Sequence, residues 1–446
     1  MDYCKISKST LTIQIFTVCV IILSYFTSRF INLIAAIICA LYLISNTTWE
    51  QRYSLFYFIF PFATVFTFQE GQTSLFIFLR LAIILAVLIY DIKKIDVNFF
   101  IRSVIFVLYC IVVSAGNEME FLKRLLNIIL WILIVYVMQG TVSGKNTLPI
   151  SRSISNGVIV ASIVGLNIDS IPGMKFGLMH QNLYLTTGEV TNRFNGLSGD
   201  PNFYTILVCI SLWAIFYEFS NKKITNAEFI VRNAICTLFG ALTFSKSCVL
   251  IVAFFWICVL FLKSNMKIFS RFIVAAMISG GIIYFLYSNP EWFETMFYRF
   301  TRGKSGSVSV NAITTGRFQL WGYYLSYMYT TASWVWGNGL AALMPYGRAS
   351  HNLILQCLYN IGFVGMIYYF SFFKKAYRNM PIQQKVTVDK IGLLAIVSIS
   401  ALAFFLDFLH IEDFYYATSL ALIFMKKPVE NVELSEPQQM NIIQQM

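Results

Sequence analysis

Long apolar stretches, separated by mostly short polar connections, run along nearly the whole chain. Many are about 15 to 20 residues long, which is the length that a helix needs to cross a hydrocarbon layer about 30 Å thick. They are apolar on every face, whereas membrane-spanning strands would show alternating segments of ~10 residues. The pattern therefore predicts an all-α, polytopic membrane protein.

The stretches give about 14 candidate membrane helices. They cover about 11–28, 30–46, 53–68, 74–90, 99–115, 121–139, 153–168, 201–219, 228–244, 247–262, 269–288, 352–371, 391–408 and 412–425. We divide the chain into N-terminal helices (1–152), a central region with two long connections (153–371), and a C-terminal helix pair with a polar tail (372–446).

Composition supports this class and sets the orientation. Hydrophobic residues make up 58% of the chain and charged residues 12%, and the mean hydropathy is +0.68. Lysine and arginine concentrate in alternate short connections, which indicates that these connections are cytoplasmic. Both termini are then predicted to be cytoplasmic. The net charge of +12 reflects this bias and does not indicate a nucleic-acid partner. The cysteines show no metal-ligand spacing, so we expect neither a metal site nor a structural disulfide.

Two connections on the predicted outer face, about 169–200 and 289–351, are much longer than the others, and loops of this length are usually functional. They hold an unexpected group of basic residues: Lys175, Arg193, Arg299, Arg302, Lys304, Arg317 and Arg348. Contact with lipid headgroups is one explanation. The other is an anion site, because the guanidinium fork matches phosphate oxygens.

The stretch "NRFNGLSGDPNF", 192–203, leads into a predicted membrane helix. Gly196 and Gly199 permit a tight turn, Asp200 is suited to cap the helix, and Pro201 fits its first position. Helix capping does not explain Arg193. In "LTFSKSCVL", 242–250, Lys246 lies in a short external turn, where it cannot serve as a cytoplasmic retention signal.

The stretch "TTGRFQLWGYYLSYM", 314–328, is typical of an amphipathic helix at the outer interface. Trp321, Tyr323 and Tyr324 favour that depth in any membrane protein. Interfacial anchoring is therefore the preferred interpretation, and stacking on a sugar ring is the alternative.

His351 and Asn352 end the larger external connection, and His351 is one of three histidines. A neutral imidazole at the water boundary can accept a proton from a hydroxyl near neutral pH. The two interpretations, a passive polar residue and a catalytic base, have comparable weight on physical grounds alone.

Two further features stay open at this point. Asp407, His410, Glu412 and Asp413 form a second candidate acid or base cluster. Arg80 lies within a predicted membrane helix, where a charge marks either a functional site or a side chain that extends to the interface.

In this order, the motifs resemble those of the O-antigen ligase and polymerase superfamily over about residues 190–370. The matching positions are Arg193 to Asn202, Lys246 where arginine is usual, Gly316, Arg317, Trp321, Gly337, Gly339, His351, Asn352, Leu355, Gly362 and Gly365. Asn360 stands where a glutamate is frequent. The N-terminal helices carry no such signature.

The resemblance implies a GT-C-like glycosyltransferase of the bacterial cytoplasmic (inner) membrane. It implies transfer on the outer face from an undecaprenyl-pyrophosphate-linked oligosaccharide, with no metal and no other cofactor. A polymerase of surface polysaccharide is our first hypothesis, and a ligase that transfers the chain to a lipid A-core acceptor is the second. A flippase or transporter of a lipid-linked glycan is a third, from a different class. Membrane lipid, a chain-length regulator and a flippase of the same pathway are the expected partners.

The resemblance also suggests roles for individual residues. His351 orients or deprotonates the acceptor hydroxyl, Asn352 holds the imidazole or the sugar, and Arg317 stabilises the leaving diphosphate. The further substrate contacts are Arg193, Lys246, Arg348, Asn202 and Trp321. The structural motif positions are Gly196, Pro201, Gly337, Gly339 and Gly362.

Overall fold

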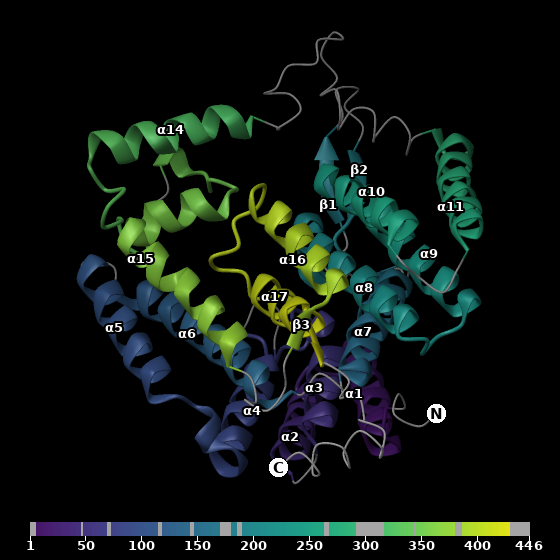
Figure 1. The fold of residues 1–446 in the computed structure, drawn as a ribbon, viewed down its shortest axis with the longest axis horizontal. Coiled ribbons are helices and arrows are strands. Elements are labelled where there is room, and N and C mark those ends of the chain that lie inside the picture. Colours follow the sequence, from purple (N-terminus) through teal and green to yellow (C-terminus); the bar gives the residue numbers. More distant parts are fainter. Residues whose placement is uncertain are drawn as a thin grey trace, which may run out of the picture.

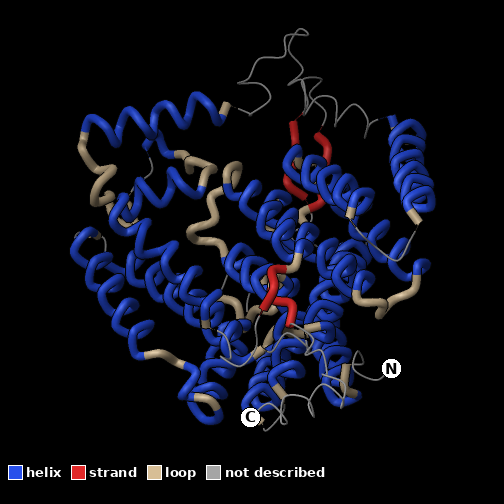
Figure 2. Tube along the Cα trace, in the orientation of Figure 1, coloured by secondary structure: helices blue, strands red, loops and turns tan. Residues whose placement is uncertain are grey.

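The computed structural model describes residues 6–45, 48–68, 73–114, 118–142, 147–169, 180–184, 190–262, 267–290, 316–342, 345–379 and 386–428. This part of the chain is predominantly helical (Figures 1 and 2). Its α-helices are α1 (Lys8–Phe26), α2 (Ile31–Ile44), α3 (Trp49–Ile59), α4 (Phe76–Tyr90), α5 (Val97–Val113), α6 (Glu118–Thr141), α7 (Leu148–Asp169), α8 (Pro201–Ser220), α9 (Asn226–Leu242), α10 (Lys246–Phe261), α11 (Ile268–Ser288), α14 (Arg317–Thr330), α15 (Leu353–Arg378), α16 (Lys390–Ala403) and α17 (Glu412–Phe424).

Short strands accompany the helices. β1 (His180–Tyr184) pairs antiparallel with β2 (Val190–Phe194), and β3 (Val386–Val388) pairs with β4 (Lys426–Pro428). The first pair lies in the shorter of the two long connections and contains Arg193. The expectation of helices alone overlooked these pairs, because each is too short to produce a long alternating pattern.

Within the described residues, five helices are long and apolar enough to cross a membrane: Lys8–Phe26, Glu120–Thr141, Leu148–Ile168, Pro201–Ser220 and Leu353–Arg378. Shorter apolar helices of 10–17 residues stand beside them, α2 and α4 among them. The helical, polytopic membrane architecture is therefore confirmed. The full set of about 14 spans stays a prediction.

Helix α8 forms the centre of the helical body (Figure 1) and is buried along almost its whole length. A helix that is apolar all round is expected at such a position. Its Trp213 indole donates to Ser398 Oγ of α16 at 3.0 Å, and the Tyr217 ring stacks on Phe424 of α17 with centroids 4.7 Å apart. Near one end of α8, buried Glu218 accepts from Arg232 Nη1 of α9 at 3.0 Å. This ion pair satisfies two charges that would be costly alone.

Helix α15 is broken at Gly362, which has φ 64° and ψ 179°. The sequence predicted one continuous membrane helix over 352–371, so the break is a correction. The connection after α14 crosses α15 at this point. Asn338 N donates to Tyr359 O, Gly339 N donates to Asn360 O, and Phe363 N donates to Trp334 O, each at 2.8 Å. Backbone groups that the break releases are thereby paired, as a membrane interior requires.

Glycines make this crossing sterically possible. Gly337 (φ 86°) and Gly339 (φ 96°) also lie in the left-handed half of conformational space. A Cβ on Gly337 would meet Asn360 O at 2.5 Å, and one on Gly362 would meet Val335 O at 2.3 Å. Gly337 and Gly362 therefore lie on opposite sides of one close contact between two backbone segments.

We predict that Gly362→Ala destabilises the protein by at least about 2 kcal/mol, because its backbone region is essentially restricted to glycine. Gly322→Ala in α14 is the matched control, because a Cβ there meets nothing within 4 Å. The midpoint of thermal unfolding of the purified protein in nanodiscs measures both. Equal midpoints for the two variants would show that the crossing does not constrain α15.

Candidate functional site

His351 lies in the turn that leads into α15 and is exposed. Its φ of 50° is uncommon for a residue with a side chain. Buried Ser350 braces the turn, because its Oγ lies 3.0 Å from the Asn352 carbonyl oxygen and 3.2 Å from Gln356 Oε1. The backbone around the imidazole is therefore fixed from within, while the ring stays accessible.

Asn352 has a structural role in this turn. Its Oδ1 accepts from the backbone N–H of Leu355 at 3.0 Å and so caps α15. Its Nδ2 donates to the carbonyl of Phe404 at 3.1 Å. Each end of the side chain thus makes one hydrogen bond within the protein, and the contact of Asn352 with the imidazole or a sugar stays a prediction.

Helix α14 is fastened to the same turn, and Figure 1 shows it lying across one end of the helical body. The Trp321 indole donates to the Ser350 carbonyl at 2.8 Å, and the Tyr324 hydroxyl donates to the Arg348 carbonyl at 2.6 Å. The Tyr324 ring also meets Tyr359 of α15 edge to face, with centroids 5.3 Å apart. The polar edge of Trp321 therefore positions α14, whereas the resemblance implied a substrate contact.

Arg317 and Asp200 approach His351 from two other segments. Arg317 is the first residue of α14, and Asp200 caps α8 by accepting from Asn202 N at 2.7 Å. Partial removal from water lowers the pKa of His351 below its ordinary value, the Arg317 charge lowers it further, and Asp200 opposes the shift. The imidazole is therefore neutral at neutral pH, as a proton acceptor must be.

A second group of predicted residues gathers at the turn between α9 and α10. Buried Arg193 donates from Nε to the Thr243 carbonyl at 2.9 Å, and Asn202 Oδ1 accepts from Ser245 Oγ at 3.0 Å. Lys246 follows directly as the first residue of α10. The first two sequence motifs thus meet in space, and Asp200 and Asn202 connect them to the surroundings of His351.

The other predicted site residues lie before or at the start of α8, near His351, or outside the described residues. Pro201 is the first residue of α8, and a Cβ on Gly196 would meet the Tyr204 ring at 2.2 Å. Arg348 is exposed three residues before His351. Other basic positions of the long connections lie outside the described residues: Lys175, Arg299, Arg302 and Lys304.

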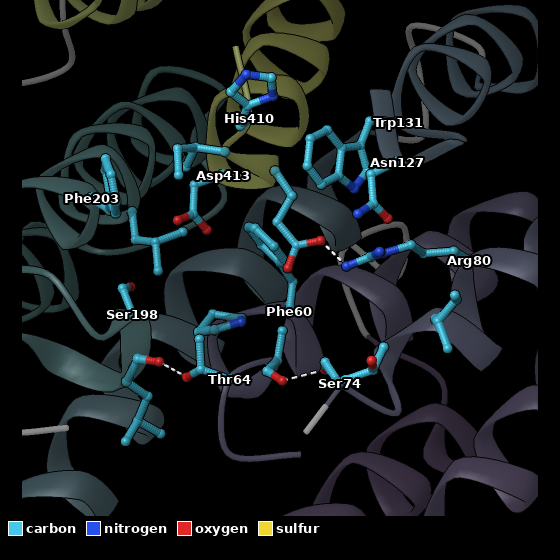
Figure 3. Close-up of a pocket in the computed structure, with 18 residues that line it drawn as sticks. Phe60, Thr64, Ser74, Arg80, Asn127, Trp131, Ser198, Phe203, His410 and Asp413 are labelled. Atoms are coloured by element: carbon cyan, nitrogen blue, oxygen red, sulfur yellow. Dashed lines mark hydrogen bonds and ion pairs between the residues drawn. The ribbon is translucent and has the colours of Figure 1, made fainter. Parts of the chain in front are cut away.

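The structure also brings together two features that the sequence left open. Arg80 of α4 forms an ion pair with Glu412 of α17, and only 6% of Arg80 is exposed. The Arg80 side chain is therefore paired within the protein. The pair lies beside a cavity of about 380 Å³ that His410 and Asp413 also line (Figure 3). The sequence indicated Arg80 and the acidic cluster as separate candidates. It gave no indication that Arg80 and Glu412, 332 positions apart, form a pair.

Leu197, Ser198 and Phe203 line this cavity as well. They flank Asp200 in the chain, so the cavity wall and the surroundings of His351 share one short segment.

Comparisons of the chain with protein-family models, curated proteins and solved structures found no match.

We predict that His351 stays neutral to a lower pH than a free imidazole does. Selective ¹³C-histidine labelling and NMR titration in nanodiscs, with His180 and His410 replaced by glutamine, would isolate its signal. Arg317→Gln should raise the His351 pKa and Asp200→Asn should lower it, because each change removes one of the two charges that act on the ring. A pKa at or above the ordinary value in the unsubstituted site would contradict the geometry.

Proposed function

We propose that the protein is a polysaccharide polymerase that joins undecaprenyl-pyrophosphate-linked oligosaccharide repeats on the outer face of the bacterial cytoplasmic membrane. The feature that supports this proposal is the exposed His351 at the turn into α15, because two charged residues of other segments, Arg317 and Asp200, act on its imidazole. About 14 spans and a GT-C-like architecture belong to the same proposal.

The proposed reaction is a displacement at the anomeric carbon of the donor sugar. The acceptor hydroxyl oxygen attacks that carbon as its proton passes to His351. The bond between the anomeric carbon and the phosphate oxygen breaks, and the diphosphate leaves with the electron pair. The new glycosidic bond therefore forms with the diphosphate carrier as the other product.

The basic residues supply the electrostatics of this step. Arg317 lies close enough to act on the charge of His351, so a diphosphate held by Arg317 would sit beside the base. Arg193 and Lys246, at the α9–α10 turn, and exposed Arg348 would hold the rest of the leaving group. Fixed cations at a developing negative charge lower the barrier, because they need no reorganisation during the reaction.

We expect His351→Ala to slow chain growth by roughly 100-fold or more, the usual effect of losing a general base, and Arg317→Ala to slow it by roughly 100- to 1,000-fold. Arg102→Ala is the matched control, because Arg102 is exposed on α5. The variants should be expressed in a host that lacks its own copy, and the surface glycan separated by length. Normal ladders with His351→Ala at normal protein levels would refute the assignment.

The acceptor separates a polymerase from a ligase that uses the same chemistry. Purified protein in nanodiscs should lengthen lipid-linked repeats in the absence of any lipid A-core acceptor. A ligase would leave those repeats unchanged until the core is added. Mass spectrometry of the lipid-linked products distinguishes the two, and His351→Ala protein is the negative control.

A further inference from the structure

The cavity beside Arg80 differs in chemistry from the basic surroundings of His351. Its lining combines aromatic rings, hydroxyl groups, an amide and carboxyl groups (Figure 3). Arg80 is already neutralised by its ion pair with Glu412. The second carboxyl group, on Asp413, makes no hydrogen bond or ion pair with another described residue. A phosphate would therefore be repelled here, and a hydrocarbon chain would leave these polar groups without partners.

One buried donor in the cavity wall points to a missing ligand. Trp131 of α6 is 6% exposed, and its indole Nε1 is buried with no hydrogen-bond partner in the described part of the chain. An unsatisfied buried N–H costs about 1–3 kcal/mol and calls for an explanation. Figure 3 places Trp131 and Asn127 on one side of the cavity, with Phe203 and Ser198 on the other and Asp413 between them.

Other polar groups of the cavity wall offer hydrogen-bond acceptors to the same ligand. Thr64 donates its hydroxyl proton to the Leu197 carbonyl, and Ser74 donates to the Ala63 carbonyl. Each hydroxyl oxygen keeps acceptor capacity toward the cavity. Asp413 adds a carboxyl group. The ligand must consequently both donate and accept hydrogen bonds at several points around an apolar body.

The side chain of His410 is also compatible with an uncharged ligand. Both of its ring nitrogens are buried without partners in the described residues, and burial lowers the pKa of His410 to about 3. A neutral imidazole offers one donor and one acceptor. The cavity volume of about 380 Å³ lies in the usual range of small-molecule sites, roughly 300–1,000 Å³.

We propose that this cavity binds one pyranose ring of a glycan, with its hydroxyl groups hydrogen-bonded to Trp131 Nε1, Asn127 and Asp413 and its apolar face against Phe203. Sugar rings have this combination of donors, acceptors and an apolar face. Only the identification of that glycan as the lipid-linked repeat rests on the proposed function. The same 197–203 segment then connects a sugar subsite to the diphosphate site at His351.

Saturation-transfer NMR tests this proposal on full-length protein in nanodiscs. The probes are the methyl pyranosides of glucose, galactose, N-acetylglucosamine and rhamnose. At least one should receive saturation, with a Kd on the order of 1 mM. Trp131→Phe and Asp413→Asn should each weaken its binding roughly five- to tenfold, the effect of one lost hydrogen bond. Inorganic pyrophosphate should not displace it.

Trp256→Phe is the matched control, because it also removes an indole N–H, here one that donates to Thr237 Oγ1 outside the cavity. It should bind like the unaltered protein. Asn127→Ala replaces Trp131→Phe if the latter fails to fold by size exclusion and thermal unfolding. Saturation of none of the four sugars, undiminished binding by Trp131→Phe and Asp413→Asn, or displacement by pyrophosphate would overturn the proposal.

Failure of the subsite and failure of the proposed function give different results. Normal chain growth in His351→Ala, with sugar binding lost in Trp131→Phe, would refute the polymerase proposal and support the sugar site. Lost chain growth in His351→Ala, with sugar binding unaffected by Trp131→Phe, would refute the sugar site and support the polymerase proposal.

Discussion

Backbone amides and carbonyls inside a membrane must find partners within the protein, and the break of α15 at Gly362 makes this requirement acute. The connection after α14 provides the partners through Trp334, Asn338 and Gly339. The Tyr109 hydroxyl adds a further contact, 2.7 Å from the Ile361 carbonyl oxygen. These contacts fix the position of the connection, which in turn places α14 near the start of α15.

From that crossing, the position of His351 follows by a chain of short contacts. Trp321 and Tyr324 fasten α14 to residues 348–350, and Ser350 and Asn352 fasten the turn to α15 and to Phe404. Arg317 is the first residue of the helix so held. Arg317 and His351, from two segments of the same long connection, are therefore brought together by backbone pairing. The Trp321 indole and the Asn352 amide contribute hydrogen bonds to this arrangement.

The molecule separates two electrostatic environments. Arg317 acts on His351, and Arg193 and Lys246 lie at the α9–α10 turn. The nearby cavity contains an arginine neutralised by its ion pair and an additional carboxyl group. A substrate that joins a diphosphate to sugars has the same division of charge. The two environments share the segment from Leu197 to Phe203, which keeps them adjacent.

The helical membrane architecture could be predicted because length and apolarity alone determine it. The residues of the candidate site could be selected from the sequence, since arginine and lysine are unexpected in connections predicted to be external. Their function stays a prediction. Their roles were harder to predict: Asn352 and Trp321 carry polar groups suited to a substrate, and only the three-dimensional arrangement shows that α15 and Ser350 use them. The Arg80–Glu412 pair depends on helix packing across 332 positions, which one sequence does not encode in any local pattern.

A lipid diphosphate bound beside His351 would be visible in an electron cryo-microscopy structure of the protein in nanodiscs with undecaprenyl pyrophosphate. We expect density for the diphosphate in contact with Arg317 and within reach of Lys246 and Arg193, next to the imidazole of His351. Diphosphate density in the cavity beside Arg80, or at a surface remote from His351, would contradict this expectation.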